Sequence, residues 1–306
     1  MRKSPLFTFT YALFFACFTF SHVAQAKTEV TIPTARGEVT LKRNPSPIAV
    51  FDTGSLDTLQ ALGVKIDAAP EALKALPYLK PTFEQAKKVG TLFEPNMEAL
   101  YALKPELIIV GTRTAKKYDE VKQLAPTIDM TDSGDHLIQS ALQRIDSFGK
   151  LFNKQAQAQA LHQEIDNLFK ATQQAVKGKG NGLIVLVNGN KISAFGIGYR
   201  LSWIHSSLGV PLADPNITGG GHGQPISFEL IQKVNPDWLF VLDRLASIGK
   251  EGQSAQETLD NELVRQTTAW KKGQVIYLSS AAYLAPGGVE QIRTDLTNIK
   301  QAFEKK

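Results

Sequence analysis

The chain has 306 residues, with 34 basic and 29 acidic side chains and a formal net charge of +5. This mild positive charge is too small to indicate nucleic-acid binding, and we expect no nucleic-acid partner. Its one cysteine is Cys17, so residues 27–306 have no disulfide framework, thiolate metal site or cysteine nucleophile. A chain of this length can bury the core of one large domain or of two ordinary domains.

Residues 1–26 have the pattern of a secretory signal peptide. Arg2 and Lys3 give a positive start, an apolar stretch follows over residues 6–20, and an Ala-Gln-Ala cleavage signature ends at Ala26. We therefore expect cleavage after Ala26 and export to the periplasm. A membrane anchor fits less well, because a spanning helix needs about 20 apolar residues. A lipoprotein signal also fits less well, because two phenylalanines and an alanine precede the cysteine where a leucine and a small residue are expected.

The first part of the exported chain alternates between strands and helical stretches. Residues 29–42 predict a β-hairpin, and the apolar runs 48–51 and 107–110 predict buried strands. Between them, residues 55–62 have helical spacing that Gly63 ends. Strands that alternate with helices indicate an α/β fold with mainly parallel sheets.

Residues 137–177 keep a helical period with no proline, and Gly149 is their one glycine. As one helix they would be about 60 Å long. A glycine-rich run ends this stretch, and the apolar strand 183–187 then opens a second half. We therefore predict a signal peptide at 1–26, an N-terminal lobe at 27–136, one long linking helix at 137–177 and a C-terminal lobe at 178–306.

The two halves share an internal repeat. A glutamate is followed seven residues later by a proline and an acid, then by an apolar strand and an arginine. The repeat runs from Glu98 to Arg113 and again from Glu229 to Arg244. Ligands of open α/β sheets bind beyond the carboxyl ends of the strands. We therefore expect one arginine from each lobe at a shared cleft, and one glutamate from each lobe at a helix start away from that cleft.

Three further residues are candidates for the same cleft. Arg200 follows a turn after the strand 191–195, and with Arg113 and Arg244 it would form an anion receptor, because arginine carries a permanent charge on a rigid fork. His222 lies among glycines, and Tyr283 lies in a loop among small residues. The alternatives are unrelated surface arginines, a solvated loop histidine and a buried aromatic at a strand end.

The sequence offers little support for an enzyme. It has no HExxH motif, no G-x-S-x-G motif and no glycine-rich loop followed by lysine and serine. His136, His162 and His205 each lack a histidine partner four residues away. An extracytoplasmic metal-dependent hydrolase, which would need clustered ligands and a general base, remains the less favoured alternative.

The run from Pro95 to Val110, together with the signal peptide and the two halves, resembles the class III periplasmic binding proteins of ABC importers, which serve siderophores, haem and cobalamin. The resemblance covers the whole exported chain, and it is greatest to the branch that binds ferric catecholate siderophores. It implies two Rossmann-like lobes joined by one long helix, with a ligand cleft between them. Haem or cobalamin on the same fold stays an alternative.

In that branch the arginines matching Arg113, Arg200 and Arg244 hold the catecholate oxygens. The resemblance further implies that His222 and Tyr283 complete the iron shell when a siderophore supplies only four donors. Ferric ion prefers six donors, and both phenolate oxygen and imidazole nitrogen suit it. We thus expect no intrinsic cofactor, since iron(III) would arrive as the siderophore complex.

The resemblance also implies that Glu98 and Glu229 dock a monomeric carrier onto an inner-membrane ABC permease with its ATPase. An alternative role for both is that of carboxylates at helix N-termini, where the helix dipole favours negative charge.

Overall fold

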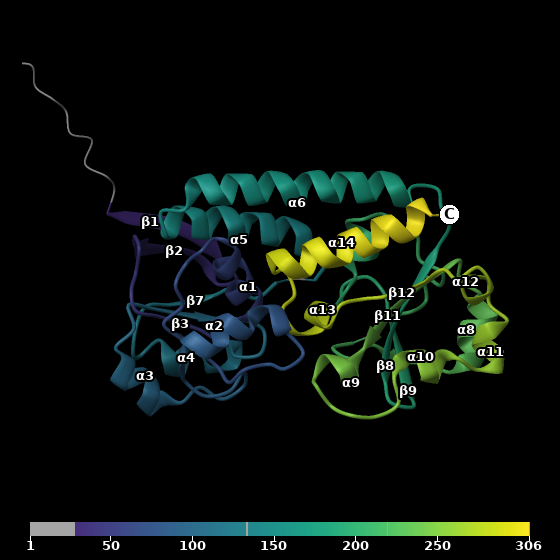
Figure 1. The fold of residues 1–306 in the computed structure, drawn as a ribbon, viewed down its shortest axis with the longest axis horizontal. Helices are drawn as coiled ribbons and strands as arrows, with labels where there is room; N and C mark the ends of the chain where they lie inside the picture. The colour runs from purple at the N-terminus through teal and green to yellow at the C-terminus, as the bar shows by residue number, and fades with distance from the viewer. Residues whose placement is uncertain (1–27, 133, 219, 306) are drawn as a thin grey trace, which may run out of the picture.

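The computed structural model describes residues 28–132, 134–218 and 220–305, so the expected signal peptide lies outside the described residues. Figure 1 shows an N-terminal lobe in purple and blue beside a C-terminal lobe in green, with the long helix α6 (Gln155–Val176) above both. The C-terminal helix α14 (Val289–Glu304) lies beneath α6 and packs against it. None of the helices in the described ranges has the length and apolar character needed to cross a membrane.

The N-terminal lobe is built on a five-stranded parallel sheet in the order β5-β4-β3-β6-β7. An antiparallel hairpin of β1 and β2 precedes this sheet, as the sequence predicts. The elements of this lobe are β1 (Glu29–Thr34), β2 (Gly37–Lys42), β3 (Ile48–Val50), α1 (Thr53–Ala61), β4 (Ala68–Ala69), α2 (Lys80–Gln85), β5 (Lys87–Lys88), α3 (Met97–Leu103), β6 (Leu107–Val110), α4 (Tyr118–Val121) and β7 (Thr127–Asp129).

The C-terminal lobe has a second five-stranded sheet, in the order β10-β9-β8-β11-β12. Strands β8, β11 and β12 pair in parallel, whereas β9 and β10 extend the sheet antiparallel at one edge. The elements are β8 (Gly182–Asn188), β9 (Lys191–Phe195), α7 (Trp203–Ser206), β10 (Gln224–Pro225), α8 (Phe228–Val234), β11 (Trp238–Asp243), α9 (Arg244–Ser247), α10 (Ala255–Leu259), α11 (Glu262–Arg265), α12 (Thr268–Lys271), β12 (Val275–Tyr277) and α13 (Ser280–Leu284).

Both sheets are buried on their two faces, as expected of parallel strands. In β3, Ile48 and Val50 join a hydrophobic core that runs through both lobes, whereas Ala49 faces the side covered by α3 and α4. In β8, Ile184 points to the shared core and Leu183 to the helices on the outer face. The lobes are therefore joined by continuous apolar packing as well as by α6.

The helical stretch that links the lobes is two helices and not one. Helix α5 (Leu137–Leu151) ends before Asn153, whose φ of +55° is incompatible with a continuing helix, and α6 begins at Gln155. The two helices pack closely at Gly149, where an added Cβ would stand 2.3 Å from the Cβ of Ala158. The prediction of a single helix from residue 137 is therefore wrong. The apolar period misleads because both helices bury one face against the same core.

The repeat seen in the sequence is also a structural repeat. Helices α3 and α8 both have seven residues, and each begins with a side chain that caps its N-terminus, Asn96 or Ser227. Each ends at a left-handed residue, Lys104 or Asn235. The strands that follow, β6 and β11, both take the fourth place in their sheets. The N-terminal and C-terminal repeats therefore share one scaffold.

The acid after the proline accepts an equivalent backbone hydrogen bond in each repeat. Glu106 accepts a hydrogen bond from the backbone N–H of Ser46, at 3.1 Å, just before β3. Asp237 accepts one from the backbone N–H of Asn181, at 3.0 Å, just before β8. Each acid thus fastens the start of the strand that pairs with its own strand.

Candidate functional site

A cleft of about 1030 Å³ lies between the lobes. The N-terminal lobe contributes the stretches 72–75, 92–94 and 112–117 to its lining, in part. The C-terminal lobe contributes residues that follow its strands, including Arg244 of α9 and Tyr283 of α13. The prediction that Tyr283 lies in a loop is therefore wrong: it is a buried residue of a short helix that directly follows β12. All five residues predicted to bind ligand line this one cleft: Arg113, Arg200, His222, Arg244 and Tyr283.

The ends of the strands place two of the arginines, as the repeat predicts. Arg113 follows the end of β6 by three residues, and Arg244 is the first residue of α9, directly after β11. Asp243 caps α9 by accepting a hydrogen bond from the backbone N–H of Ala246, which holds the start of that helix at the strand end. Arg200 comes after β9, beyond a turn in which Gly198 takes a φ of +91°.

Tyr283 lies at the centre of the three arginines. Its backbone carbonyl accepts hydrogen bonds from Nη2 of Arg113, at 2.5 Å, and from Nη1 of Arg200, at 3.2 Å. Its phenol oxygen accepts one from Nε of Arg244, at 3.2 Å. The three guanidinium carbons lie 5.5, 4.7 and 5.9 Å from the ring centroid, within the range of cation–π attraction. One tyrosine therefore gathers arginines from both lobes.

The cleft carries an excess of positive charge. Burial lowers the pKa of the Arg113 guanidinium, and the charge of Arg200 lowers it further; burial likewise lowers the pKa of Arg200. Both remain charged, because an arginine pKa starts above 12. The ion pairs that the described residues form include neither of these two arginines nor Arg244. The arrangement therefore suits an anionic ligand.

His222 is exposed at the edge of the cleft. Its backbone carbonyl accepts a hydrogen bond from Oγ of Ser193, at 2.6 Å, which ties the loop to β9. Within the described residues, no group of three or more histidine, cysteine, aspartate or glutamate side chains is placed to hold a metal ion. His222 and Tyr283 are thus two single donors that face a shared space from different segments.

The glutamates Glu98 and Glu229 are both exposed, each in the first turn of its helix. Glu98 is absent from the lining of the cleft, as predicted. Glu229 lines a second cavity, of about 620 Å³, which also touches His222 and Arg244. The C-terminal glutamate therefore lies nearer to the ligand residues than the sequence predicts.

Several lining residues of the N-terminal lobe were not singled out from the sequence, and Lys74, Lys116 and Phe93 are three of them. Lys74 and Lys116 add positive charge to the cleft, and Phe93 exposes 64% of its surface there. All three lie in loops or short turns with no repeated pattern, so no local signal marks them.

Comparison with known proteins finds curated relatives that match over most of the chain. Residues 48–282 match the sequence model of a family described as periplasmic binding protein. The petrobactin-binding protein YclQ of Bacillus subtilis is 38% identical over 267 residues, which cover 86% of this chain and 84% of that protein. The ferric-anguibactin-binding protein FatB of Vibrio anguillarum is 32% identical over 287 residues, which cover 91% and 88%.

Solved structures agree with these matches. The structure of YclQ gives a TM-score of 0.84 at 34% identity and covers 92% of this chain and 100% of its own. The periplasmic catecholate-siderophore binding protein VctP of Vibrio cholerae gives a TM-score of 0.84 at 31% identity and covers 89% and 99%. The two-lobe fold is thus the fold of these binding proteins.

Proposed function

The chain belongs to the periplasmic binding protein family, and from this premise we propose that it captures a ferric catecholate siderophore and delivers it to an ABC importer. Its relatives are binding proteins for transport, and the chain is a substrate-binding protein rather than an enzyme. Those relatives are named for petrobactin, anguibactin and catecholate siderophores, which supports a ferric siderophore as the ligand here. Iron(III) is then cargo and not a resident cofactor.

The observation that carries the proposal is the set of three arginines around Tyr283 in the cleft between the lobes. Catecholate oxygens bound to iron keep negative charge, and guanidinium groups donate strong hydrogen bonds to such oxygens. The arginines are free of carboxylate partners among the described residues. Their charge is therefore available to an anionic complex.

We assign His222 and Tyr283 as the two protein ligands of iron in a tetradentate complex. A siderophore with two catecholates supplies four oxygens, which leaves two of the six positions on iron open. The phenol oxygen of Tyr283 accepts a hydrogen bond from Arg244, so a cation adjoins the charge of a phenolate at that position. His222 reaches the same cleft from the opposite loop. A hexadentate siderophore would leave neither side chain a position on iron.

Direct coordination is tested by comparing how much each variant loses in affinity for a tetradentate and for a hexadentate ferric siderophore. His222→Ala and Tyr283→Phe should each weaken a tetradentate ferric siderophore by about 10–100-fold, the usual cost of losing a metal ligand or its support. A hexadentate complex should lose far less. Tryptophan-fluorescence titrations measure both affinities, and the visible spectrum reports the tyrosinate-to-iron transition that Tyr283→Phe should remove.

Matched controls are available in the same chain. Tyr101 exposes 70% of its surface on α3, and His162 lies on α6, so Tyr101→Phe and His162→Ala should change neither affinity. Equal losses for both siderophores in His222→Ala and Tyr283→Phe would exclude direct coordination. Haem and cobalamin are the competing ligands, and visible spectra of the purified protein with each would detect their binding. Binding of either one without binding of a ferric catecholate would overturn the proposal.

Delivery completes the proposed function. We propose that the carrier is exported to the periplasm, acts as a monomer, and meets an inner-membrane ABC permease with its ATPase through Glu98 and Glu229. The support is that both carboxylates are exposed at equivalent positions of the two repeats. A pair of equivalent sites on a pseudo-symmetric carrier suits a two-fold symmetric partner.

A further inference from the structure

The segment that carries Tyr283 belongs to the C-terminal lobe in sequence, but N-terminal side chains hold its backbone. The carbonyl of Leu284 accepts hydrogen bonds from Oγ1 of Thr53, at the start of α1, and from Nη1 of Arg113, at 3.1 Å. Arg113 also donates to the carbonyl of Tyr283 itself. Two residues of the N-terminal lobe therefore fix two consecutive carbonyls at the candidate iron site.

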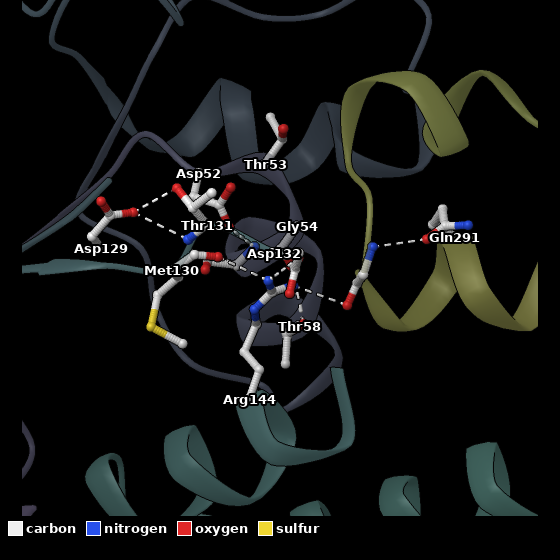
Figure 2. A network of polar contacts seen from close by, with 12 residues as sticks. Asp52, Thr53, Gly54, Thr58, Asp129, Met130, Thr131, Asp132, Arg144 and Gln291 are labelled. Atoms are coloured by element: carbon white, nitrogen blue, oxygen red, sulfur yellow. Dashed lines mark hydrogen bonds and ion pairs between the residues drawn. The ribbon is translucent and has the colours of Figure 1, made fainter. Parts of the chain in front are cut away.

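Arg144 extends this attachment beyond Tyr283. Only 2% of this α5 residue is exposed, and its guanidinium forms an ion pair with Asp132. The same guanidinium donates to the carbonyl of Gly287, at 3.0 Å, and to that of Met130, at 3.1 Å. Figure 2 shows it directed at Asp132 and Met130, beside Gly54 of α1. A buried charge is thus used to hold one carbonyl of the segment after Tyr283.

Glycines make the close approach possible. A Cβ on Gly54 would stand 2.4 Å from the carbonyl oxygen of Pro286, and a Cβ on Gly288 would stand 2.3 Å from Oδ2 of Asp57. Side chains at these two positions would push the segment away from α1. The fit is therefore built into the backbone of both partners.

The end of the segment is held in the same way. The carboxylate of Asp57, on α1, accepts hydrogen bonds from the backbone N–H groups of Glu290, at 2.9 Å, and Gln291, at 3.2 Å. These belong to the first turn of α14, whose N–H groups have no partner within the helix. After Tyr283 the segment is thus bonded to the N-terminal lobe or α5 at Leu284, Gly287, Glu290 and Gln291.

His222 and Arg244 are attached differently. The carbonyl of His222 is bonded to Ser193 of β9, and Nη1 of Arg244 donates to Oδ1 of Asn188, at 3.3 Å, at the end of β8. Both residues therefore follow the C-terminal sheet. Tyr283 is held from both lobes: Arg113 of the N-terminal lobe and Arg200 of the C-terminal lobe bond its carbonyl, and Arg244 bonds its phenol. His222, by contrast, is bonded only through the C-terminal sheet in the contacts described above.

We propose that Thr53 and Arg144 are positioning residues that fasten the backbone just after Tyr283 to the N-terminal lobe and α5, so that the phenol of Tyr283 is held beside Arg244 in place for iron. This inference rests on the proposed function for the role of Tyr283, but the attachment itself can be measured without iron. Loosening it should move Tyr283 and leave the arginines' charge in the cleft.

Thr53→Val tests the proposal, because valine keeps the shape of threonine and removes the hydroxyl that donates to Leu284. In the ligand-free protein, hydrogen exchange of the amides in segment 283–288 should become about three- to tenfold faster, in line with the loss of one hydrogen bond. Thr53→Ser keeps the hydroxyl and should restore slow exchange. Unchanged exchange in Thr53→Val would overturn the proposal whatever the ligand is.

The iron-dependent readout is separate. Thr53→Val should weaken a tetradentate ferric siderophore by about three- to tenfold and shift the tyrosinate-to-iron band, with less than about twofold change for a hexadentate one. Equal weakening of both, or an unshifted band, would refute a positioning role. Arg144→Ala should act in the same direction, although it also leaves Asp132 buried without its partner. If the ferric complex of Tyr283→Phe has the same visible spectrum as that of the wild type, Tyr283 is not an iron ligand and the proposed iron site fails. The hydrogen-exchange result would still show whether Thr53 holds the segment.

Discussion

Arg113 follows β6 in the N-terminal lobe, Arg244 follows β11 in the C-terminal lobe, and the elements before them correspond one by one. Yet the two arginines contact different parts of Tyr283. Arg113 donates to backbone carbonyls of Tyr283 and Leu284, whereas Arg244 donates to the phenol oxygen. The repeated scaffold thus places two equivalent arginines, and each contacts a different part of the segment that carries Tyr283. The N-terminal arginine supports the chain, and the C-terminal arginine adjoins the donor atom.

The largest expected effect is a loss of siderophore uptake when the glutamates at the helix starts of both repeats are removed. The double change Glu98→Ala with Glu229→Ala should reduce uptake of siderophore-bound radioactive iron through the transporter by about tenfold or more, because charge pairs at an interface set orientation and encounter rate. Binding of the siderophore in solution should stay intact. The control is Glu38→Ala with Glu262→Ala, one exposed glutamate from each lobe.

Glu98→Ala and Glu229→Ala, each made alone, should reduce uptake by similar factors, because the two glutamates occupy equivalent positions in the two repeats. Normal uptake by the double variant would refute the docking role. Lost ligand binding in Glu229→Ala alone would instead place that residue in ligand capture, through the cavity that it shares with His222 and Arg244.

The next prediction compares Arg113 and Arg244 in ligand affinity and in stability. Arg113→Ala and Arg244→Ala should each weaken every anionic catecholate complex by about 1.5–3 kcal/mol, the usual contribution of hydrogen bonds to charged groups. Arg113→Ala should in addition lower the free energy of unfolding more than Arg244→Ala, because it leaves two backbone carbonyls with fewer donors. Fluorescence titration and chemical denaturation measure the two quantities. Equal stabilities would mean that Arg113 does not support the segment.

A smaller effect concerns the acids after the prolines. Asp237→Ala should lower the free energy of unfolding by about 1–2 kcal/mol, because the half-buried N–H of Asn181 loses its acceptor. Glu106→Ala should cost less, since Glu106 is exposed and water can replace it. Urea denaturation of both variants checks the order, and a larger loss in Glu106→Ala would contradict it.

The smallest effect should differ between the two repeats, at the residue that ends each helix. Lys104 and Asn235 both end their helices in the left-handed region, with φ of 51° and 46°. Lys104→Gly should stabilise the fold by about 0.5–1 kcal/mol, because glycine adopts this conformation without a Cβ penalty. Asn235→Gly should not, because the side chain of Asn235 accepts a hydrogen bond from the backbone N–H of Thr268, at 2.7 Å. Thermal unfolding distinguishes the two, and stabilisation by both would show that this bond contributes little.

Much of the fold was predictable from local patterns. The strands at 48–51, 107–110 and 183–187 and the helix ended by Gly63 are present close to the predicted bounds. The repeat was readable because its glutamate, proline and acid lie close together in the sequence of each half. Local patterns failed between α5 and α6, where both sides of the break bury apolar residues in one core and the period continues unbroken.

Local patterns predicted the α/β class, the two halves and the placing of Arg113 and Arg244 at strand ends, because strand and turn signals act over short distances. The protein class came from the resemblance to the binding-protein family. Which residues hold Tyr283, and that they come from both lobes, depends on the tertiary structure. Its carbonyl meets Arg113 across 170 residues of chain, and Leu284 meets Thr53 across 231. Contacts over such separations depend on how whole elements pack, and no pattern of neighbouring residues encodes them. The same holds for Lys74 and Lys116, which reach the cleft only because the two lobes enclose it.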